Sequence, residues 1–306
     1  MDNSYCCCGL CTVKHPMNDA LPYTFGGIKK IPAGKARFII LPIPYEGTIS
    51  FKPGTRFAPE AIIFSSRYME LYEEETNTQP WENGIITLSE ITQDVHSAEK
   101  MMKKIQRNVK KLLKDNKFVF ALGGEHSISF PIISEYKHKY PDLRVLHFDA
   151  HADLRKQYEG SKFSHASVMR RISELNCEIY SFGIRSLSNE EAKDLQELKN
   201  VHIHFAHNCR NQALIDKADS LPDGNYYISI DIDCFDPSVV PDTGTPEPGG
   251  FTWYEITDFL RKFASTHKII GADIVELAPS NHYCASAFLA AKLVYKLIAY
   301  ICANEL

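Results

Sequence analysis

Short apolar runs of strand-like composition alternate with stretches of helical spacing along most of this 306-residue chain. The first run, ARFIILPIP, occupies residues 36–44, and six more follow it: KFVFALGG, RVLHFDA, CEIYSFGI, VHIHFA, NYYISIDI and KIIGADIVEL. The stretches between them include APEAIIFSSRYMELY and the charged amphipathic segment SAEKMMKKIQRNVKKLLKDN. Such alternation predicts a mostly parallel sheet with helices on both faces. No linker or internal repeat divides the chain, so we expect an α/β fold in a single domain.

The composition argues against several classes of partner. The net charge is −4 and the pI is about 6.3, so the charge balance indicates no surface for nucleic acid or anionic lipid. No apolar run approaches the roughly 20 residues of a membrane span, and the N-terminus lacks the charged-then-apolar layout of a secretory signal. We therefore expect a cytoplasmic protein with no nucleic-acid and no membrane partner.

The cysteines fall into two groups. Five are scattered, which is typical of reduced thiols rather than of a disulfide framework: Cys177, Cys209, Cys234, Cys284 and Cys302. Four stand together in CCCGLC: Cys6, Cys7, Cys8 and Cys11. This cluster could bind a soft metal or act in redox chemistry, but we favour a flexible tail with incidental cysteines. We divide the chain into an N-terminal segment, 1–30, and a main domain, 31–306.

Chemically active residues follow directly on several predicted strands. GGEHS comes after one strand, HADLR ends another, DIDCFDP ends a third and VELAP ends the last. In open parallel sheets, ligands bind beyond the carboxyl ends of the strands. We therefore expect these four motifs to lie at one edge of the sheet and to form one site.

HFDAHADLR, residues 147–155, carries the densest set of such residues. Asp149, His151 and Asp153 stand at every second position, which in a strand would aim all three side chains the same way. Two carboxylates held that close repel each other, and burying them unpaired would cost several kcal/mol each. A positive charge must lie between them, whether a metal ion, an arginine or a substrate.

The other three motifs supply further candidates. Asp231 and Asp233 in SIDIDCFDP again stand two apart and are expected to share a face. His126 follows a glycine turn, and Glu276 lies near the end of the final strand. We interpret three more residues as structural, the first as the start of a turn: Asp236, His147 and His202.

Two imidazoles and four aspartates suit two divalent ions better than one. Oxygen ligands favour manganese or magnesium, and imidazole shifts the preference toward transition metals, so manganese is the first choice. Iron, cobalt or zinc could replace it. Four carboxylates balance two dications, and a bridging hydroxide would leave the cluster mildly anionic, which favours a cationic substrate.

The motifs GGEHS, DAHAD, SIDIDCFDPS followed by TGTPEPGG, and the late VE together resemble the ureohydrolase family, which contains the arginases and agmatinases. The resemblance covers about residues 36–300. It implies a three-layer α/β/α fold, a homo-oligomer (a trimer or hexamer) and a binuclear manganese site in a catalytic domain, 31–306. It assigns one ion to His126, Asp149, Asp153 and Asp231. It assigns the other to Asp149, His151, Asp231 and Asp233, so that Asp149 and Asp231 bridge the two.

The resemblance also implies how such a site hydrolyses a guanidino group to an amine and urea. Two metal ions lower the pKa of a shared water toward about 7 and so supply hydroxide at neutral pH. Asp153 orients this hydroxide as well as binding metal, and Glu276 holds the planar guanidinium by a paired contact. His165 in FSHASVMRRI protonates the leaving amine, although the family more often has HG where this chain has HA.

Agmatine is the substrate that the sequence favours, with putrescine and urea as products. The loop DLRKQYEGSKFSHAS lacks the asparagine- and serine-rich composition with which arginases grip a carboxylate. The aspartates that arginases carry after a GLR strand end are replaced here by Ser186 and Ser188 of GIRSLS. Glu247 in TGTPEPGG and Glu159 are candidate partners for the distal ammonium of agmatine.

Arg155 leaves other interpretations open. It could bind the carboxylate of 4-guanidinobutyrate or a related guanidino acid, or it could form a structural ion pair with a neighbour such as Glu159; we favour the ion pair. Arginine ranks third as a substrate. A deacetylase on a similar sheet would lack the paired DAHAD and DID pattern with a late Glu276. A non-catalytic homologue would be expected to have lost a metal ligand, and all six are present.

Overall fold

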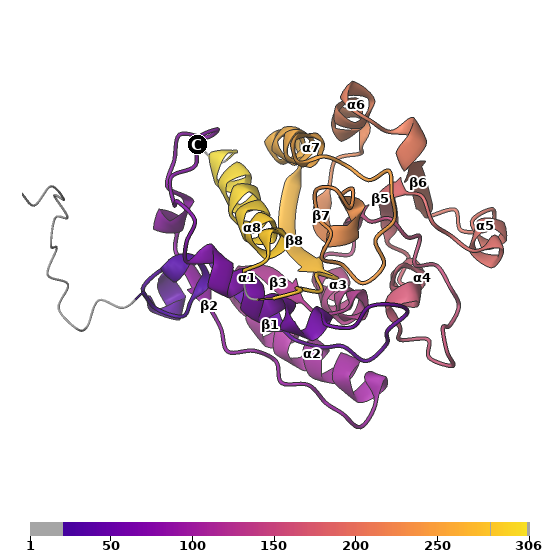
Figure 1. Ribbon diagram of the computed structural model, residues 1–306, viewed down its shortest axis with the longest axis horizontal. Coiled ribbons are helices and arrows are strands. Elements are labelled where there is room, and N and C mark those ends of the chain that lie inside the picture. Colours follow the sequence, from indigo (N-terminus) through magenta and orange to yellow (C-terminus); the bar gives the residue numbers. More distant parts are fainter. Residues whose placement is uncertain (1–20, 282, 305–306) are drawn as a thin grey trace, which may run out of the picture.

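The computed structural model describes residues 21–281 and 283–304, so the cluster of Cys6, Cys7, Cys8 and Cys11 lies outside the described residues. Within the described ranges, eight parallel strands form one sheet in the order β2-β1-β3-β8-β7-β4-β5-β6 (Figure 1). The strands are β1 Phe38–Ile43, β2 Ile85–Thr87, β3 Phe118–Gly123, β4 Arg144–Phe148, β5 Glu178–Ile184, β6 Val201–Phe205, β7 Asn225–Asp231 and β8 Lys268–Val275. The prediction of an α/β fold with a parallel central sheet is confirmed.

All seven predicted runs form strands, and their apolar side chains alternate between two buried layers. Ile40 and Phe120 belong to the core on one face of the sheet, whereas Ile39 and Val119 belong to the core on the other. Strands that are buried on both faces read as continuous apolar runs, which is why the sequence marks them clearly. Strand β2 was not predicted from the sequence, because it has only three residues and lies at the edge of the sheet beside β1.

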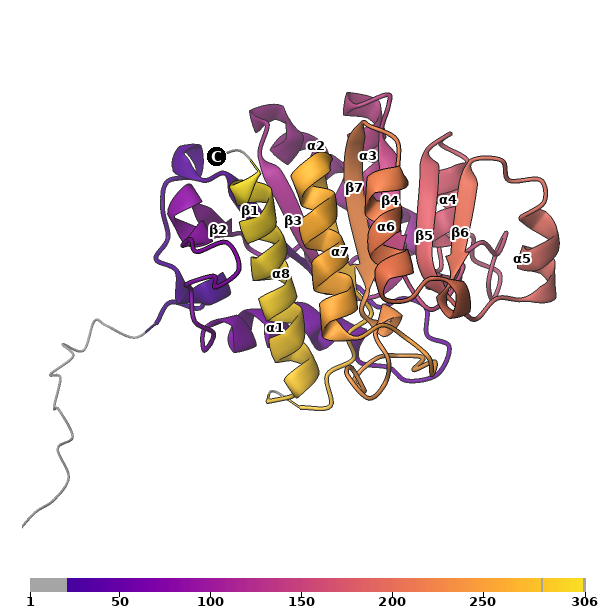
Figure 2. The same ribbon diagram turned by 90° about the horizontal axis from the view of Figure 1, so that it is seen from above.

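Helices cover both faces of the sheet and complete three layers (Figure 2). On one face lie α1, α6, α7 and α8, on the other lie α2, α3 and α4, and α5 lies at the end of the sheet that carries β6. The helices are α1 Ala58–Ser66, α2 Ala98–Leu112, α3 Ser129–Lys139, α4 Val168–Ser173, α5 Asn189–Asp194, α6 Gln212–Ser220, α7 Trp253–Thr266 and α8 Ala285–Ala303.

Short 3₁₀ helices occur in the connecting segments. Six of them are η1 Phe25–Gly27, η2 Ala33–Lys35, η3 Thr55–Phe57, η4 Pro80–Asn83, η5 Leu113–Asp115 and η8 Ala206–Asn208. Three others carry predicted site residues: η6 His126–Ile128, η7 His165–Ser167 and η9 Ile232–Cys234. These three place side chains just beyond strand ends or at the start of a helix.

Helix α8 is a core helix, although in length and composition it could cross a membrane; the described residues contain one such helix. The expectation that no apolar run approaches that length therefore needs correction. Its most apolar window is 78% buried inside the molecule. Figure 2 shows it lying across one face of the sheet between α1 and α7.

The segment before β1 packs onto the sheet where the structure describes it. Phe25 is fully buried, and its N–H donates to the hydroxyl of Thr87 at 2.9 Å. The N–H of Gly26 donates to the hydroxyl of Ser66 at 2.8 Å. Ser66 is also the last residue of α1, which ends well before residue 72, the end of the predicted helical stretch.

Candidate metal centre and active site

The predicted site residues meet beyond the carboxyl ends of β3, β8, β7 and β4, four strands that are neighbours at the centre of the sheet. His126 opens the 3₁₀ helix that follows β3, and Glu276 directly follows β8. Asp231 is the last residue of β7, and Asp149 directly follows β4. The sheet therefore brings together motifs that are up to 150 residues apart, as in the N–H of His126 and Oε1 of Glu276 at 2.6 Å.

The alternation predicted for the DAHAD motif is wrong in one respect. Strand β4 ends at Phe148, so Asp149, His151 and Asp153 lie in a loop rather than along a strand. Local contacts bring them together instead: the N–H of His151 donates to Oδ1 of Asp149 at 2.6 Å, and Asp153 has a left-handed backbone, φ 53°. Non-glycine residues with a left-handed backbone, such as Asp153, are uncommon and often occur at functional sites. Asp233 also lies beyond its strand, in a 3₁₀ turn after β7.

One cluster of donor atoms surrounds His126. Its Nδ1 lies 3.1 Å from Oδ2 of Asp149, 3.1 Å from Oδ2 of Asp153 and 3.4 Å from Oδ2 of Asp231. All four side chains are at least nine-tenths buried. This is the predicted set of ligands for the first ion, brought to within contact distance.

The hydrogen bonds of Nε2, the other ring nitrogen of His126, indicate whether Nδ1 can bind a metal ion. The hydroxyl of Ser229 donates to Oδ1 of Asp273 at 2.7 Å, so its oxygen accepts the Nε2–H of His126 at 3.0 Å. Nδ1 of His126 is buried and has no hydrogen-bond partner among the residues that the structure describes. In a neutral ring it presents a lone pair toward three carboxylates. A cation at that point would satisfy all four groups, so the donor set fits a metal ion.

A second cluster surrounds His151. Its Nδ1 lies 2.9 Å from Oδ2 of Asp233 and 3.5 Å from Oδ1 of Asp149. Asp149 thus directs Oδ2 toward His126 and Oδ1 toward His151, the arrangement of a bridging ligand. Asp231 directs Oδ2 toward His126, and its Oδ1 accepts the N–H of Asp233 at 2.9 Å. The described side chains that could hold a metal include the trio of Asp149, His151 and Asp233.

The electrostatics of the cluster favour a bound cation. Burial and the charges of Asp233 and Asp149 raise the pKa of Asp231 well above its ordinary value. Burial and the charge of Asp149 raise the pKa of Asp153 to about 7. Burial also opposes the charge of Asp149, but the neighbouring rings of His126, His147 and His151 hold its pKa well below the usual range. Carboxylates that repel each other in a buried site gain most from a divalent ion between them.

His147, predicted to be structural, contacts a proposed metal ligand. It is fully buried; its Nε2 lies 2.9 Å from Oδ2 of Asp149, and its Nδ1 lies 2.9 Å from the hydroxyl of Ser181. Burial lowers the pKa of His147, which favours a neutral ring that donates to Asp149. Its position two residues before Asp149 was the signal that could have identified it. His202, by contrast, pairs with Glu178 at 2.8 Å near the surface.

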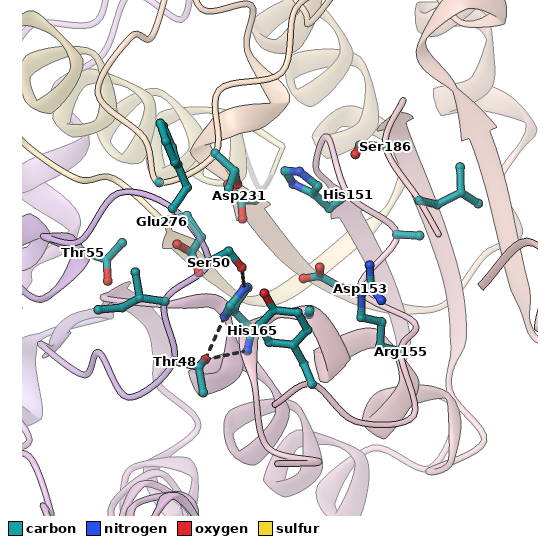
Figure 3. Close-up of a pocket in the computed structure, with 18 of the residues that line it drawn as sticks. Thr48, Ser50, Thr55, His151, Asp153, Arg155, His165, Ser186, Asp231 and Glu276 are labelled. Carbon is teal, nitrogen blue, oxygen red and sulfur yellow. Dashed lines mark hydrogen bonds between the residues drawn. The ribbon is translucent and has the colours of Figure 1, made fainter. Parts of the chain in front are cut away.

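A cavity of about 250 Å³ opens beside the two clusters (Figure 3). Glu276 lines it with a left-handed backbone, φ 64°, and its Oε1 accepts the N–H of His126. Burial and the charge of Glu125 raise the pKa of Glu276 well above its ordinary value. A cationic group in the cavity would therefore be attracted to the carboxylate and would favour its charged form.

His165 lines the same cavity, between two hydroxyl groups (Figure 3). Its Nδ1 is 2.8 Å from Oγ1 of Thr48, and its Nε2 is 2.7 Å from Oγ of Ser50. Burial is the main cause that lowers the pKa of His165 to about 4, so the ring is neutral at pH 7. Sequence analysis missed Thr48 and Ser50, because they lie in a loop after β1 that none of the four motifs includes.

The candidate contacts for the far end of a substrate are dispersed. Arg155 lines the cavity, with its Nε 3.9 Å from Oε2 of Glu191 and its guanidinium 5.6 Å from the ring centre of Tyr158. The favoured ion pair therefore involves Glu191 in place of Glu159, which is exposed and is not among the residues that line the cavity. Oε1 of Glu247 lies 3.8 Å from Nε2 of His151, outside the lining residues as well.

The two serines of GIRSLS have different surroundings. Ser186 and Ser188 both line the cavity, but Ser188 also caps α5 through a reciprocal hydrogen-bond pair with Glu191. Asp236 has the structural role predicted for it, because its carboxylate accepts the N–H groups of Ser238 and Gly249 at 3.0 and 2.8 Å.

With this fold and a double His/Asp cluster at the centre of the sheet edge, the chain belongs to the arginase family. The family model for arginases matches residues 36–299. The predicted resemblance to ureohydrolases is confirmed.

Similar proteins place the chain within that family. It is 37% identical over 277 residues to the N(1)-aminopropylagmatine ureohydrolase of Synechocystis sp., an alignment that covers 87% of this chain and 89% of the relative. It is 34% identical to the agmatinase of Bacillus cereus, over 86% and 91% of the two chains. The crystal structure of a putative agmatinase from Clostridium difficile superposes with a TM-score of 0.81 at 33% identity, covering 87% and 97%. The chain is thus an agmatinase-like ureohydrolase, a hydrolase that acts on C–N bonds.

Proposed function

We propose that this protein is a binuclear manganese hydrolase that converts agmatine and water into putrescine and urea. The observation that carries the proposal is the position of Nδ1 of His126, a buried nitrogen without a hydrogen-bond partner among the described residues that faces three carboxylates within 3.4 Å. A buried carboxylate, Glu276, lies at the same cavity and suits a guanidinium.

The two clusters would hold the two ions. His126, Asp149, Asp153 and Asp231 would bind one, and Asp149, His151, Asp231 and Asp233 would bind the other. When bound, the two ions would lower the pKa of a water between them toward about 7 and so supply the nucleophile. Mixed carboxylate and imidazole ligation favours manganese over magnesium.

The side chains around the ions would position the reactants. Oε1 of Glu276 already accepts the N–H of His126, so Oε2 is the principal acceptor for the guanidinium, with the second lone pair of Oε1 beside it. Asp153 would accept a hydrogen bond from the nucleophile and aim it at the guanidinium carbon. His165 would take a proton at Nε2 from the attacking water and, as the C–N bond breaks, give it to the leaving amine. Agmatine and water then yield putrescine and urea, with atoms and charge conserved.

The charges that line the cavity support a cationic substrate. Carboxylates of Asp153, Asp231 and Glu276 line it beside the two clusters, and Glu191 lines it too. The described residues of the lining include two cations, Lys52 and Arg155. The ammonium of Lys52 donates to the carbonyl of Ala278 at 3.0 Å.

Two alternatives remain as specific competitors. The names of the curated relatives favour N(1)-aminopropylagmatine, a longer guanidine with a second ammonium. Arg155 in the cavity lining favours a guanidino acid. A cytoplasmic location and a homo-oligomeric assembly are part of the same proposal.

A substrate panel tests the proposal. The full chain, dialysed against a chelator and reloaded with manganese, is assayed for urea release from agmatine, N(1)-aminopropylagmatine, 4-guanidinobutyrate and arginine at equal concentration. We expect two manganese ions per chain by elemental analysis and the largest kcat/KM with agmatine. Full activity with one ion per chain, or no urea from any guanidine, would contradict the proposal. A larger kcat/KM with aminopropylagmatine would identify that compound as the substrate and leave the proposed chemistry unchanged.

A further inference from the structure

Glu125 ties the GGEHS motif to the loop that follows β1. Its N–H donates to the carbonyl of Tyr45 at 2.8 Å, and a side chain on Gly124 would collide with that same carbonyl oxygen. In return, Oε2 of Glu125 accepts the N–H of Gly47 at 2.6 Å and the N–H of Thr48 at 2.5 Å. The loop is thereby held with Thr48 against the wall of the cavity.

Two hydroxyl groups complete the environment of Glu125. Oε1 accepts the hydroxyl of Ser127 at 2.5 Å and the hydroxyl of Thr48 at 3.0 Å. Four donors thus converge on one buried side chain. Burial raises the pKa of Glu125 to about 7, and these donors oppose that rise and favour the ionised carboxylate, which only accepts. A threonine hydroxyl has a single proton, and in Thr48 that proton is committed to Glu125.

This commitment decides the tautomer of His165. Because the oxygen of Thr48 has only lone pairs left to offer, it accepts the backbone N–H of His165 at 3.2 Å and the Nδ1–H of the ring at 2.8 Å. Nε2 of the neutral ring is then a lone pair, and it accepts the hydroxyl of Ser50 at 2.7 Å. Ser50 is exposed and lines the cavity, so Nε2 lies on the cavity side of the ring (Figure 3).

We propose that Thr48, oriented by Glu125, is a positioning residue that fixes His165 in the tautomer with its proton on Nδ1. This inference rests on the role of His165 in the proposed function. A neutral imidazole must take a proton at Nε2 before it can give that proton to a leaving amine, while Nδ1 keeps its own. In the other tautomer Nε2 already carries a hydrogen, so it cannot accept a proton. Giving up that hydrogen would leave an unfavourable imidazolate.

Nuclear magnetic resonance of the ring nitrogens tests the tautomer directly. The full chain is labelled with ¹⁵N-histidine, Mg²⁺ is added as a diamagnetic ion, and the signals of His165 are assigned as those missing from His165→Ala. We expect a protonated Nδ1 and an unprotonated Nε2 in the wild type. We expect Thr48→Val to shift both signals toward a mixture of tautomers, and Thr48→Ser, which keeps the hydroxyl, to restore the wild-type pattern. An Nε2–H tautomer in the wild type would overturn the inference.

Kinetics in a double-mutant cycle test whether Thr48 acts through His165. Losing the imidazole in His165→Ala should lower kcat by roughly 10²–10⁴, and Thr48→Val should lower it by a smaller factor, about 10-fold or more. Metal content should stay at the wild-type value, because neither residue is among the proposed ligands. In the His165→Ala background, Thr48→Val should have no further effect on kcat. Equal losses in both backgrounds would show that Thr48 acts independently of His165.

Matched variants separate this role from a general loss of stability. Thr76→Val removes a hydroxyl that bonds only to Thr78, at 2.7 Å in the α1–β2 segment, and should leave kcat unchanged. If Thr48→Val fails to fold, Thr48→Ala replaces it in both experiments. If no guanidine is hydrolysed, the proposed function fails, whereas the tautomer of His165 is still decided by its nitrogen signals.

Discussion

His147 and Asp149 are joined by a hydrogen bond of 2.9 Å between Nε2 and Oδ2, the same carboxylate oxygen that lies 3.1 Å from Nδ1 of His126. The bond fixes the orientation of the proposed bridging carboxylate from outside the cluster. The hydroxyl of Ser181 fixes the other side of the ring at 2.9 Å. The directions of both carboxylate oxygens of Asp149 therefore depend on a histidine that is not one of the proposed metal ligands.

His147→Ala should weaken metal binding while leaving all six proposed ligands in place. Partners that orient a metal ligand typically contribute a factor of about 10–100 in affinity, so we expect a loss of that size in manganese affinity by isothermal titration. His202→Ala removes a histidine that pairs with Glu178 near the surface and serves as the control. Unchanged affinity in the His147 variant would mean that Asp149 is held by other contacts.

Asp149→Ala should abolish turnover, because it removes the ligand assigned to both ions. The remaining buried carboxylates would then repel each other without a shared cation, so metal content should fall as well. Asp219→Ala, which removes an exposed carboxylate paired with Lys262 at 3.1 Å, is the matched control. Urea release near the wild-type rate from a metal-loaded Asp149 variant would refute the binuclear assignment.

Much of the fold and the proposed ligand set could be predicted from the sequence, for a physical reason. Strands buried on both faces must be apolar throughout, and charged residues directly after them are costly unless they have a partner. The sequence could not indicate that Asp149, His151 and Asp153 curl in a loop, because the left-handed backbone of Asp153 depends on tertiary contacts. The role of Thr48 could not be predicted for a similar reason, because a threonine in an irregular loop belongs to no recognisable sequence pattern.

The far end of the substrate site was the least predictable part. Arg155 could be placed in the cavity from its position beside DAHAD, but its partner Glu191 lies 36 positions farther along the chain. Proximity in sequence suggested Glu159, which is exposed. Only the packing of α5 beside the loop brings Glu191 there, through the N–H of Leu154, which donates to Oε1 of Glu191 at 2.9 Å.

The stability of the metal-free protein should depend on Asp153 and pH. Burial and Asp149 raise the pKa of Asp153 to about 7, whereas in the unfolded chain an aspartate titrates near about 3.9. Between these values the folded state holds a proton that the unfolded state releases, so this contribution to the free energy of unfolding decreases as pH rises from 4 toward 7. Asp153→Asn has no such proton to lose.

Urea denaturation in the presence of a chelator measures this effect. The free energy of unfolding of the wild type, minus that of Asp153→Asn, should decrease steadily as pH rises from 4 to 7. In Asp219→Asn, the matched variant of the exposed Asp219, the difference should stay flat. Manganese should reverse the wild-type trend, because it binds the charged carboxylates. A pH-independent difference for Asp153→Asn would mean that the carboxyl keeps an ordinary pKa in the folded protein.

Arg155→Ala decides between a cationic substrate and a guanidino acid. With agmatine, the guanidinium of Arg155 is a like charge near a dication, and Glu191 at 3.9 Å balances it only in part. Removing it should leave kcat/KM for agmatine unchanged or raised. With 4-guanidinobutyrate, the same change would remove a cation that lines the cavity and could receive the carboxylate, and KM should rise steeply. Lys156→Ala is the matched control, because the neighbouring Lys156 pairs with Asp194 at 3.0 Å and does not line the cavity. A wild type that prefers guanidinobutyrate, together with an Arg155 variant that loses this preference, would establish the guanidino acid as substrate and overturn the assignment to agmatine.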